Sequence, residues 1–210
     1  MFKNRYLLSL VVTLLAIIAM SFFGPEEKTL GESVRIVYIH GAWVLTAEIA
    51  FFLAALAGLV GLIGQWNRFQ GSSFGRRAQH WSRALGWTGM VFWITYLPLS
   101  LWAMQANWSG LFLSEPRFRL ALTFAVVGLL LQIGLWLVNR LWLTSLSNLF
   151  FLIALWLTFA SAEYVMHPPP SPIFNSGNVG IQLFFASLNL LVLVAAYFLA
   201  GYFLTQTSDR

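Results

Sequence analysis

Two histidines, His40 and His167, are the residues of this sequence whose type and placement point most directly to chemistry. Each stands at one end of a long apolar stretch, where an imidazole is costly unless it finds a partner. Neutral imidazole is a common ligand of haem iron, and two such groups on different helices at the same depth could hold one flat cofactor between them. The spacing therefore allows a bis-histidine site for non-covalent haem b. The alternative is that both rings simply hydrogen-bond to backbone carbonyls.

Two carboxylates stand near these histidines in the expected helices. Glu163 precedes His167 by one helical turn, so we expect its carboxylate to accept the second ring N–H and fix the tautomer, or to be an ordinary polar residue at a helix end. Glu48 lies two turns deeper than His40, about 12 Å further in at 1.5 Å per residue. A carboxylate at that depth is either functional or a buried hydrogen-bonding strut.

The segment from Trp102 to Arg117 is rich in aromatic and apolar residues although it connects two apolar stretches. Aromatic residues at this position are typical of the membrane interface, where they act as anchors. The segment could instead form a shelf, with Trp108 at its centre, that covers the edge of a porphyrin. Arg117, with Arg119 and Arg35, would then pair with the propionates, since arginine suits bidentate contact with carboxylates.

The elements that must position these residues are transmembrane helices. The chain has 210 residues, of which 59% are hydrophobic and 9% charged, with a mean hydropathy of +0.76. About 20 apolar residues cross a bilayer as a helix, and none of the stretches alternates like a barrel strand. We therefore predict an all-α, polytopic bundle of about six transmembrane helices in a single domain, residues 1–210, with spans near 6–23, 37–63, 84–105, 120–138, 145–166 and 180–204.

The orientation of the bundle follows from its positive charge. With the N-terminus inside, the cytoplasmic segments carry most of the basic residues, so both termini should be cytoplasmic. Three outer loops result, over about residues 24–36, 106–119 and 167–179. The basic connection from Gln65 to Arg83 is then a solvated cytoplasmic loop, in which we interpret His80 as a surface residue. The apolar run that starts at Tyr6 is expected to be a retained span rather than a cleaved signal peptide.

Composition also restricts the chemistry. Without cysteine, the chain has no disulfide, thiolate metal site or covalently attached haem. The net charge of +5 is scattered over short connections and forms no basic stripe, so we expect no nucleic-acid partner. Gly58, Gly61 and Gly64 recur at intervals of three and favour close approach of a neighbouring helix.

Several motifs resemble one known family in the same order. Ser33-Val34-Arg35-Ile36, then Tyr38-Ile39-His40 and Ala42-Trp43, is similar to the run before the second span in the haem-handling C subunit of the cytochrome c maturation system, a member of the cytochrome c assembly proteins. Met166-His167-Pro168 resembles that family's motif after the fifth span. Its tryptophan-rich outer segment aligns on Trp108 to Arg117, but Leu111, Phe112, Ser114 and Glu115 replace three tryptophans and an aspartate.

The resemblance implies a function without catalysis. His40 and His167 would be axial haem ligands, with Trp43, Trp108, Arg117 and Glu163 as further haem-binding residues. The protein would hold haem at the outer face of a bacterial inner membrane and pass it to a periplasmic haem chaperone, together with other maturation subunits and an ATP-binding transporter. Two alternatives stay open: a structural subunit of a larger membrane complex without haem, and a membrane b-type electron-transfer cytochrome.

Overall fold

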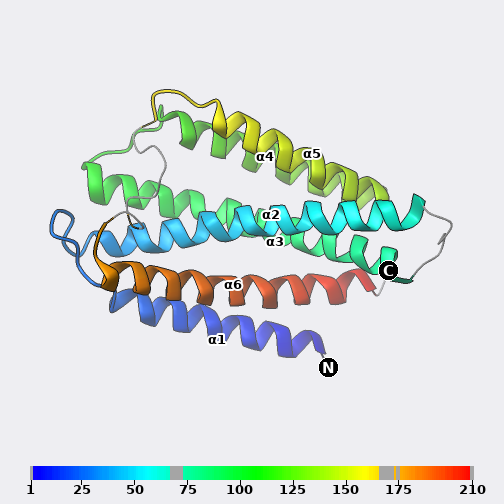
Figure 1. The fold of residues 1–210 in the computed structure, drawn as a ribbon, viewed down its shortest axis with the longest axis horizontal. Helices are drawn as coiled ribbons and strands as arrows, with labels where there is room; N and C mark the ends of the chain where they lie inside the picture. Colours follow the sequence, from blue (N-terminus) through cyan, green and yellow to red (C-terminus); the bar gives the residue numbers. More distant parts are fainter. Residues whose placement is uncertain (1, 67–72, 166–172, 174–175, 209–210) are drawn as a thin grey trace.

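The computed structural model describes residues 2–66, 73–165, 173 and 176–208, and in them the chain forms an all-α bundle (Figure 1). Each helix contains a stretch long and apolar enough to cross a membrane, so the predicted fold class and number of spans are confirmed. The helices are α1 (Phe2–Phe22), α2 (Val34–Trp66), α3 (Ser73–Trp108), α4 (Pro116–Val138), α5 (Leu141–Ala160) and α6 (Val179–Ser208).

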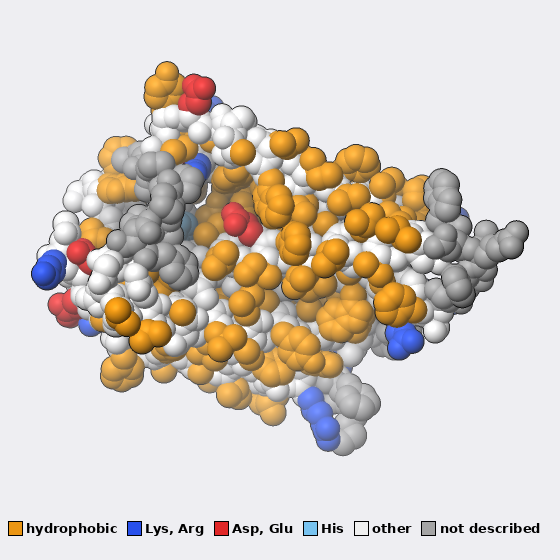
Figure 2. Space-filling view, viewed as in Figure 1, with side chains coloured by type: hydrophobic (Ala, Val, Ile, Leu, Met, Phe, Trp, Pro, Cys, Tyr) orange, Lys and Arg blue, Asp and Glu red, His pale blue; other side chains and the backbone are white. Residues whose placement is uncertain are grey.

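The surface of the bundle is as apolar as its interior. Large hydrophobic side chains such as Leu8, Leu130 and Leu157 are about two-thirds exposed, and Figure 2 shows hydrophobic side chains along the length of one face. A water-soluble bundle would place charged residues there, because it must cover its apolar side chains. These helices instead expose apolar side chains outward, as helices surrounded by lipid do.

The centre of the bundle is the pair formed by α2 and α3, which make the most extensive helix contact. Helices α4 and α5 lie on one side of this pair, while α6 and then α1 lie on the other (Figure 1). The core is built from fully buried side chains of four helices: Tyr38, Met90, Trp93, Leu155 and Leu188. The candidate ligand His40 therefore belongs to a helix that is held on both sides.

Both termini lie at the same end of the bundle in Figure 1. We call this the terminal end, and the opposite end, where residues 23–33, 109–115 and 161–178 connect the helices, the outer end. The described basic residues of the terminal end include Lys3, Arg5, Arg76 and Arg77, whereas the outer end mixes both signs of charge (Figure 2). By the positive-inside rule, we expect the terminal end to be cytoplasmic.

The structure corrects several predicted boundaries. Helix α3 begins at Ser73, so His80 and Arg83 are helical and the predicted loop is wrong over residues 73–83, while residues 67–72 lie outside the described residues. This polar stretch packs against the bundle instead of remaining in solvent: Gly75, Gln79 and Ser82 are buried, and the buried Arg83 donates a hydrogen bond to Oδ1 of Asn139 at 2.9 Å. Likewise, the first two outer connections are shorter than predicted, because α2, α3 and α4 extend past the apolar stretches.

A buried polar network, which we call the middle network because it lies between the helices, joins α3, α4 and α5 in the half of the bundle nearer the terminal end. Asn148 donates from Nδ2 to the backbone oxygen of Ser82 at 2.9 Å and to its hydroxyl at 3.1 Å, while Gln132 donates to Oδ1 of Asn148 at 2.9 Å. All three residues are buried. Gly58 lets α2 approach the same place, since a Cβ there would lie 2.8 Å from the carbonyl oxygen of Ser145. The predicted close approach at Gly58 is thus confirmed.

Candidate functional site

His40 lies in the second turn of α2, at the outer end of the bundle. Its ring is half-buried, and its centroid is 5.6 Å from that of Tyr96 on α3, with the two planes tilted by 48°. The helix is fixed at this place because Val34, Tyr38 and Ala42, spaced four residues apart, form a buried stripe. The sequence run that precedes His40 therefore anchors α2 and sets the depth of the imidazole.

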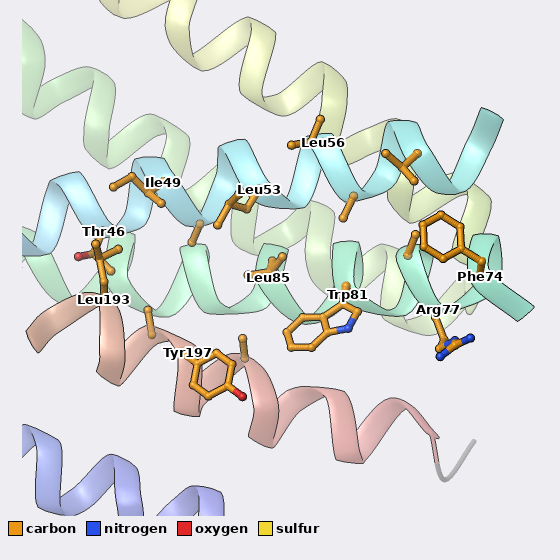
Figure 3. A pocket seen from close by; sticks show the side chains of 16 residues that line it. Thr46, Ile49, Leu53, Leu56, Phe74, Arg77, Trp81, Leu85, Leu193 and Tyr197 are labelled. Atoms are coloured by element: carbon orange, nitrogen blue, oxygen red, sulfur yellow. The ribbon is translucent and has the colours of Figure 1, made fainter. Parts of the chain in front are cut away.

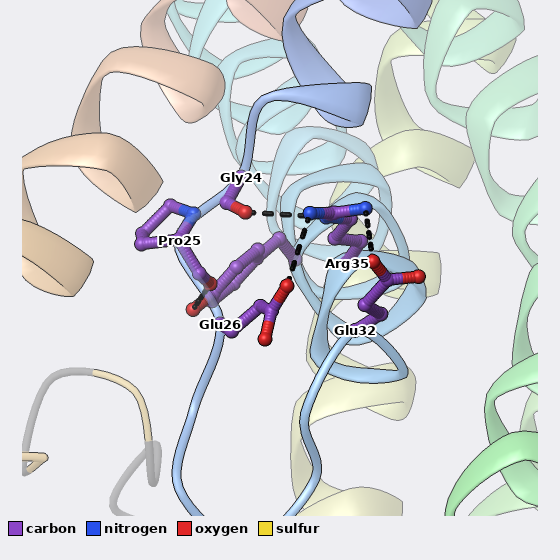
Figure 4. A network of polar contacts seen from close by, with 6 residues as sticks. Gly24, Pro25, Glu26, Glu32 and Arg35 are labelled. Atoms are coloured by element: carbon purple, nitrogen blue, oxygen red, sulfur yellow. Dashed lines mark hydrogen bonds and ion pairs between the residues drawn. The ribbon is translucent and has the colours of Figure 1, made fainter.

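Arg35 ties the first outer connection to the start of α2 (Figure 4). Its guanidinium lies 3.6 Å from a carboxylate oxygen of Glu26 and 3.6 Å from one of Glu32, and its Nε donates to the carbonyl of Gly24 at 3.2 Å. The hydroxyl of Tyr38 adds a bond to the carbonyl of Pro25 at 3.0 Å. The expectation that Arg35 would be available to a propionate is not supported, because two carboxylates already surround it.

Trp43 holds α2 against α3. Its indole N–H donates to the hydroxyl of Thr95 at 3.0 Å, and its ring centroid lies 5.2 Å from that of Phe92. This predicted haem-binding residue therefore has a structural partner already. We assign it the positioning of the helix that carries His40.

Glu48 is the only acidic residue within the six described helices. It is half-buried, and Arg117, at the start of α4, attracts it electrostatically. Glu48 and Glu115 in turn both act electrostatically on the phenol of the buried Tyr96. Together with His40 these residues form an ionisable group, which we call the outer cluster: His40, Glu48, Tyr96, Glu115 and Arg117.

The surface is hollowed near this end of the bundle. Figure 2 shows an acidic side chain surrounded by hydrophobic ones beside a hollow, with a basic and a histidine side chain at its margin. A hollow lined by apolar surface and a few ionisable groups is the usual character of a cofactor site.

The connection between α3 and α4 carries the predicted shelf. Trp108 is half-buried at the end of α3, and its ring meets Phe112 edge-on with centroids 5.8 Å apart. Leu111 and Leu113 are both 55% exposed. Ser109 makes the turn, with a positive φ of 52°. The connection thus presents apolar side chains outward, as the shelf interpretation requires and as an interfacial anchor would also do.

Glu115 ends this connection as the N-cap of α4. Its buried side chain accepts from the backbone N–H of Phe118 at 2.6 Å, and Pro116 follows at the first helical position. The Glu-Pro pair is a helix-start pattern that the sequence already contained. The cap fixes the first turn of α4 and therefore the position of Arg117.

The second predicted ligand, His167, lies outside the described residues. Its expected partner Glu163 is described, and it is exposed beyond the end of α5 at Ala160. The prediction that Glu163 lies within the fifth helix is wrong, while its position relative to His167 stays a prediction. The backbone N–H of Ser161 closes the helix on Leu157 at 3.1 Å, and Tyr164 has a positive φ of 56°, which a right-handed helix does not continue.

Tyr96 and Glu115 are members of the outer cluster that sequence reasoning missed. Tyr96 is a polar residue within an apolar span. Only the packing of α2 on α3 shows that it lies on the face of α3 next to His40. Within the described part of the chain, no group of three or more His, Asp or Glu side chains is arranged to hold a metal ion. A bis-histidine haem site needs only two protein ligands, so it does not depend on such a group.

Comparisons of the chain with protein-family models, curated proteins and solved structures found no match.

Proposed function

We propose that this protein holds non-covalent haem b at the outer end of the bundle, with His40 and His167 as the two iron ligands, as a membrane component of cytochrome c assembly. The observation that carries the proposal is the placement of His40: half-buried, at the outer end, beside Tyr96 and the ionisable residues Glu48 and Arg117. An imidazole at a membrane interface with such neighbours suits a cofactor better than it suits lipid.

The donor set present agrees with haem. A neutral imidazole supplies one axial nitrogen, and Arg117 supplies a cation for a propionate at the margin of the site. Trp108 and Phe112 offer apolar surface to the porphyrin edge. Haem itself supplies the iron chemistry, and the role of this chain is to bind, orient and shelter it.

Passing haem on completes the proposed role. A site at the outer end is accessible from the periplasmic side if the terminal end is cytoplasmic, so a periplasmic haem chaperone is the expected recipient. The sequence contains no phosphate-binding glycine-rich loop, and any ATP use in the process belongs to a partner such as an ATP-binding transporter.

The test is haem titration of the purified, detergent-solubilised protein, followed by absorption spectroscopy and pyridine haemochrome analysis. We expect a low-spin, six-coordinate spectrum for the wild type, and its loss in a His40→Ala, His167→Ala double variant. His80→Ala is the matched control, because His80 lies on α3 near the terminal end. A double variant that keeps the low-spin spectrum would eliminate the assignment.

A second pair of variants tests the propionate partner. Arg117→Gln should weaken haem binding about tenfold, the effect of removing one hydrogen bond to a charged group. Arg119, which the sequence suggested as a further propionate partner, is exposed while Arg117 is half-buried, so Arg119→Gln should leave the affinity unchanged. Equal affinities for the two variants would remove Arg117 from the site. Purification without haem and with stoichiometric partner subunits would favour the structural-subunit alternative instead.

A further inference from the structure

A groove runs along the outside of the bundle between α2, α3 and α6, and no residue of the outer cluster lines it (Figure 3). Its volume is about 780 Å³. It exists because alanines stand where larger side chains would close the gap between these helices: Ala50, Ala57, Ala78, Ala196 and Ala200. Leucines such as Leu53, Leu85 and Leu193 form much of its walls, so the groove is apolar over most of its length.

One end of the groove is different in character. Arg77 lies there, beside Phe74, and Trp81 lies between Arg77 and the leucine-lined part (Figure 3). No carboxylate lines the groove, and Arg77 is its one cation among the described residues. Arg77 is exposed, and its described contact is a hydrogen bond from Nε to the carbonyl of Ser73 at 3.3 Å. This end therefore attracts an anion.

The dimensions agree with one lipid leaflet. Along α2 the lining extends from Thr46 to Val60, about 21 Å at 1.5 Å per residue, and one leaflet with its headgroup region is about 20 to 22 Å thick. Arg77 lies near the start of α3, so the charged end faces the terminal end of the bundle. Trp81 and Tyr197 have the amphipathic rings that are typical of the interface between headgroups and acyl chains.

We propose that this groove binds an anionic phospholipid of the leaflet at the terminal end, with its phosphate at Arg77 and one acyl chain along the leucines. Among the described residues, a single cation at one end of an otherwise apolar groove favours a lipid over a partner helix, because a phospholipid carries one anionic headgroup next to apolar chains. The positive charge at this end is complementary to the phosphate of an anionic lipid, whereas an acyl chain without a headgroup has no charge to match it.

The first test is native mass spectrometry of the full chain with phosphatidylglycerol and with phosphatidylcholine. We expect phosphatidylglycerol to bind more tightly, and Arg77→Gln to weaken it about fivefold, the effect expected for one cation near an anionic lipid. Arg77→Lys should retain most of the affinity. Arg76→Gln is the matched control, since Arg76 is also exposed but does not line the groove. Equal losses for Arg77→Gln and Arg76→Gln would overturn the proposal.

The second test uses the wild-type chain and so does not depend on the folding of a variant. Phosphatidylglycerol with a diazirine in its acyl chain should label peptides that contain Leu53, Leu85 or Leu193 after irradiation in nanodiscs. Labelling spread evenly over all six helices would overturn the proposal. Protection of these leucines by a second copy of the chain, or by a co-purified membrane protein, would also overturn it and assign the groove to a protein contact. Neither result bears on haem binding at the outer end.

Discussion

Polar residues inside this bundle have two different kinds of surroundings. In the middle network, the amides of Asn148 and Gln132 and the hydroxyl of Ser82 are buried and bonded directly to one another at 2.9 to 3.1 Å. In the outer cluster, Glu48 and His40 are half-buried, and a ring contact and electrostatic attraction join them to Tyr96 and Arg117. The first arrangement is held by hydrogen bonds among the protein's own groups, and within the described residues Oε1 of Gln132 is its one polar side-chain atom without a hydrogen bond.

The difference has a physical reason. Uncharged amides in a helix bundle satisfy one another at low desolvation cost and therefore fix the positions of helices. Ionisable groups at a membrane depth are costly, and they are usually found where they pair or line a path or site. The middle network is thus expected to determine stability, and the outer cluster to determine binding. Three predictions test that division, from the largest expected effect to the smallest, and a fourth concerns a carboxylate outside both regions.

Gly58→Leu should have the largest effect on stability. A Cβ at Gly58 would lie 2.8 Å from the backbone oxygen of Ser145 and 3.0 Å from the hydroxyl of Ser82, so the side chain must force α2 away from the middle network. We expect a loss of about 3 kcal/mol in the free energy of unfolding, measured by SDS titration. Gly134→Leu is the control, because nothing lies within 4 Å of a Cβ there. Equal losses for the two variants would show that replacing a glycine in any helix lowers the free energy of unfolding, and that the close approach of α2 at Gly58 does not determine it.

Asn148→Leu should cost less, about 1 to 2 kcal/mol. The substitution leaves the amide of Gln132 and the hydroxyl of Ser82 buried without their present partner. The thermal midpoint in detergent measures the loss, while haem affinity is expected to stay at the wild-type value. If Asn148→Leu abolished haem binding in a protein that remained folded, the division between the two regions would be wrong.

Glu48→Leu should change the free energy of unfolding by less than about 1 kcal/mol. Within the described residues no hydrogen bond reaches its carboxylate, and its attraction to Arg117 is offset by the cost of removing a charge from water. Because the carboxylate belongs to the outer cluster, we expect haem affinity to fall although stability does not. A loss of stability as large as that of Asn148→Leu would instead make Glu48 a structural strut.

The sequence predicts some of these features better than others. The placement of His40 at the outer end follows from the apolar stretches and the positive charge, and both are local properties. The start of α3 at Ser73 was missed because its polar residues resemble a loop, and their contacts with α2 and with Asn139 are known only from the helix packing. The membership of Tyr96 in the outer cluster depends on how α2 packs on α3, and no sequence pattern along one helix predicts this packing.

The end of α5 is harder to predict from the sequence. A purely apolar criterion carries the helix past Ala160, but the backbone turns at Ser161, and Tyr164 takes a positive φ without a glycine to indicate it. The error moved Glu163 onto a helix and suggested a contact with His167. By contrast, the sequence does contain the pair Glu115-Pro116 at which α4 begins. This pair was overlooked as a helix start because the segment was interpreted from its aromatic residues as a shelf.

The smallest expected effect concerns Glu27, in the first outer connection and outside both polar regions. The backbone N–H groups of Thr29 and Leu30 donate to its carboxylate at 2.7 and 3.0 Å and hold the pKa of Glu27 below its ordinary value. A lowered folded-state pKa means that the carboxylate contributes stability above the unfolded pKa, and that this contribution is lost as pH falls through the folded pKa. Glu27→Gln should therefore be slightly less stable than the wild type near neutral pH, and the difference between their thermal midpoints should shrink below about pH 4. A difference that grows on acidification would mean that the loop does not need the charged form, and that the contacts of Arg35 and Tyr38 hold the connection before His40.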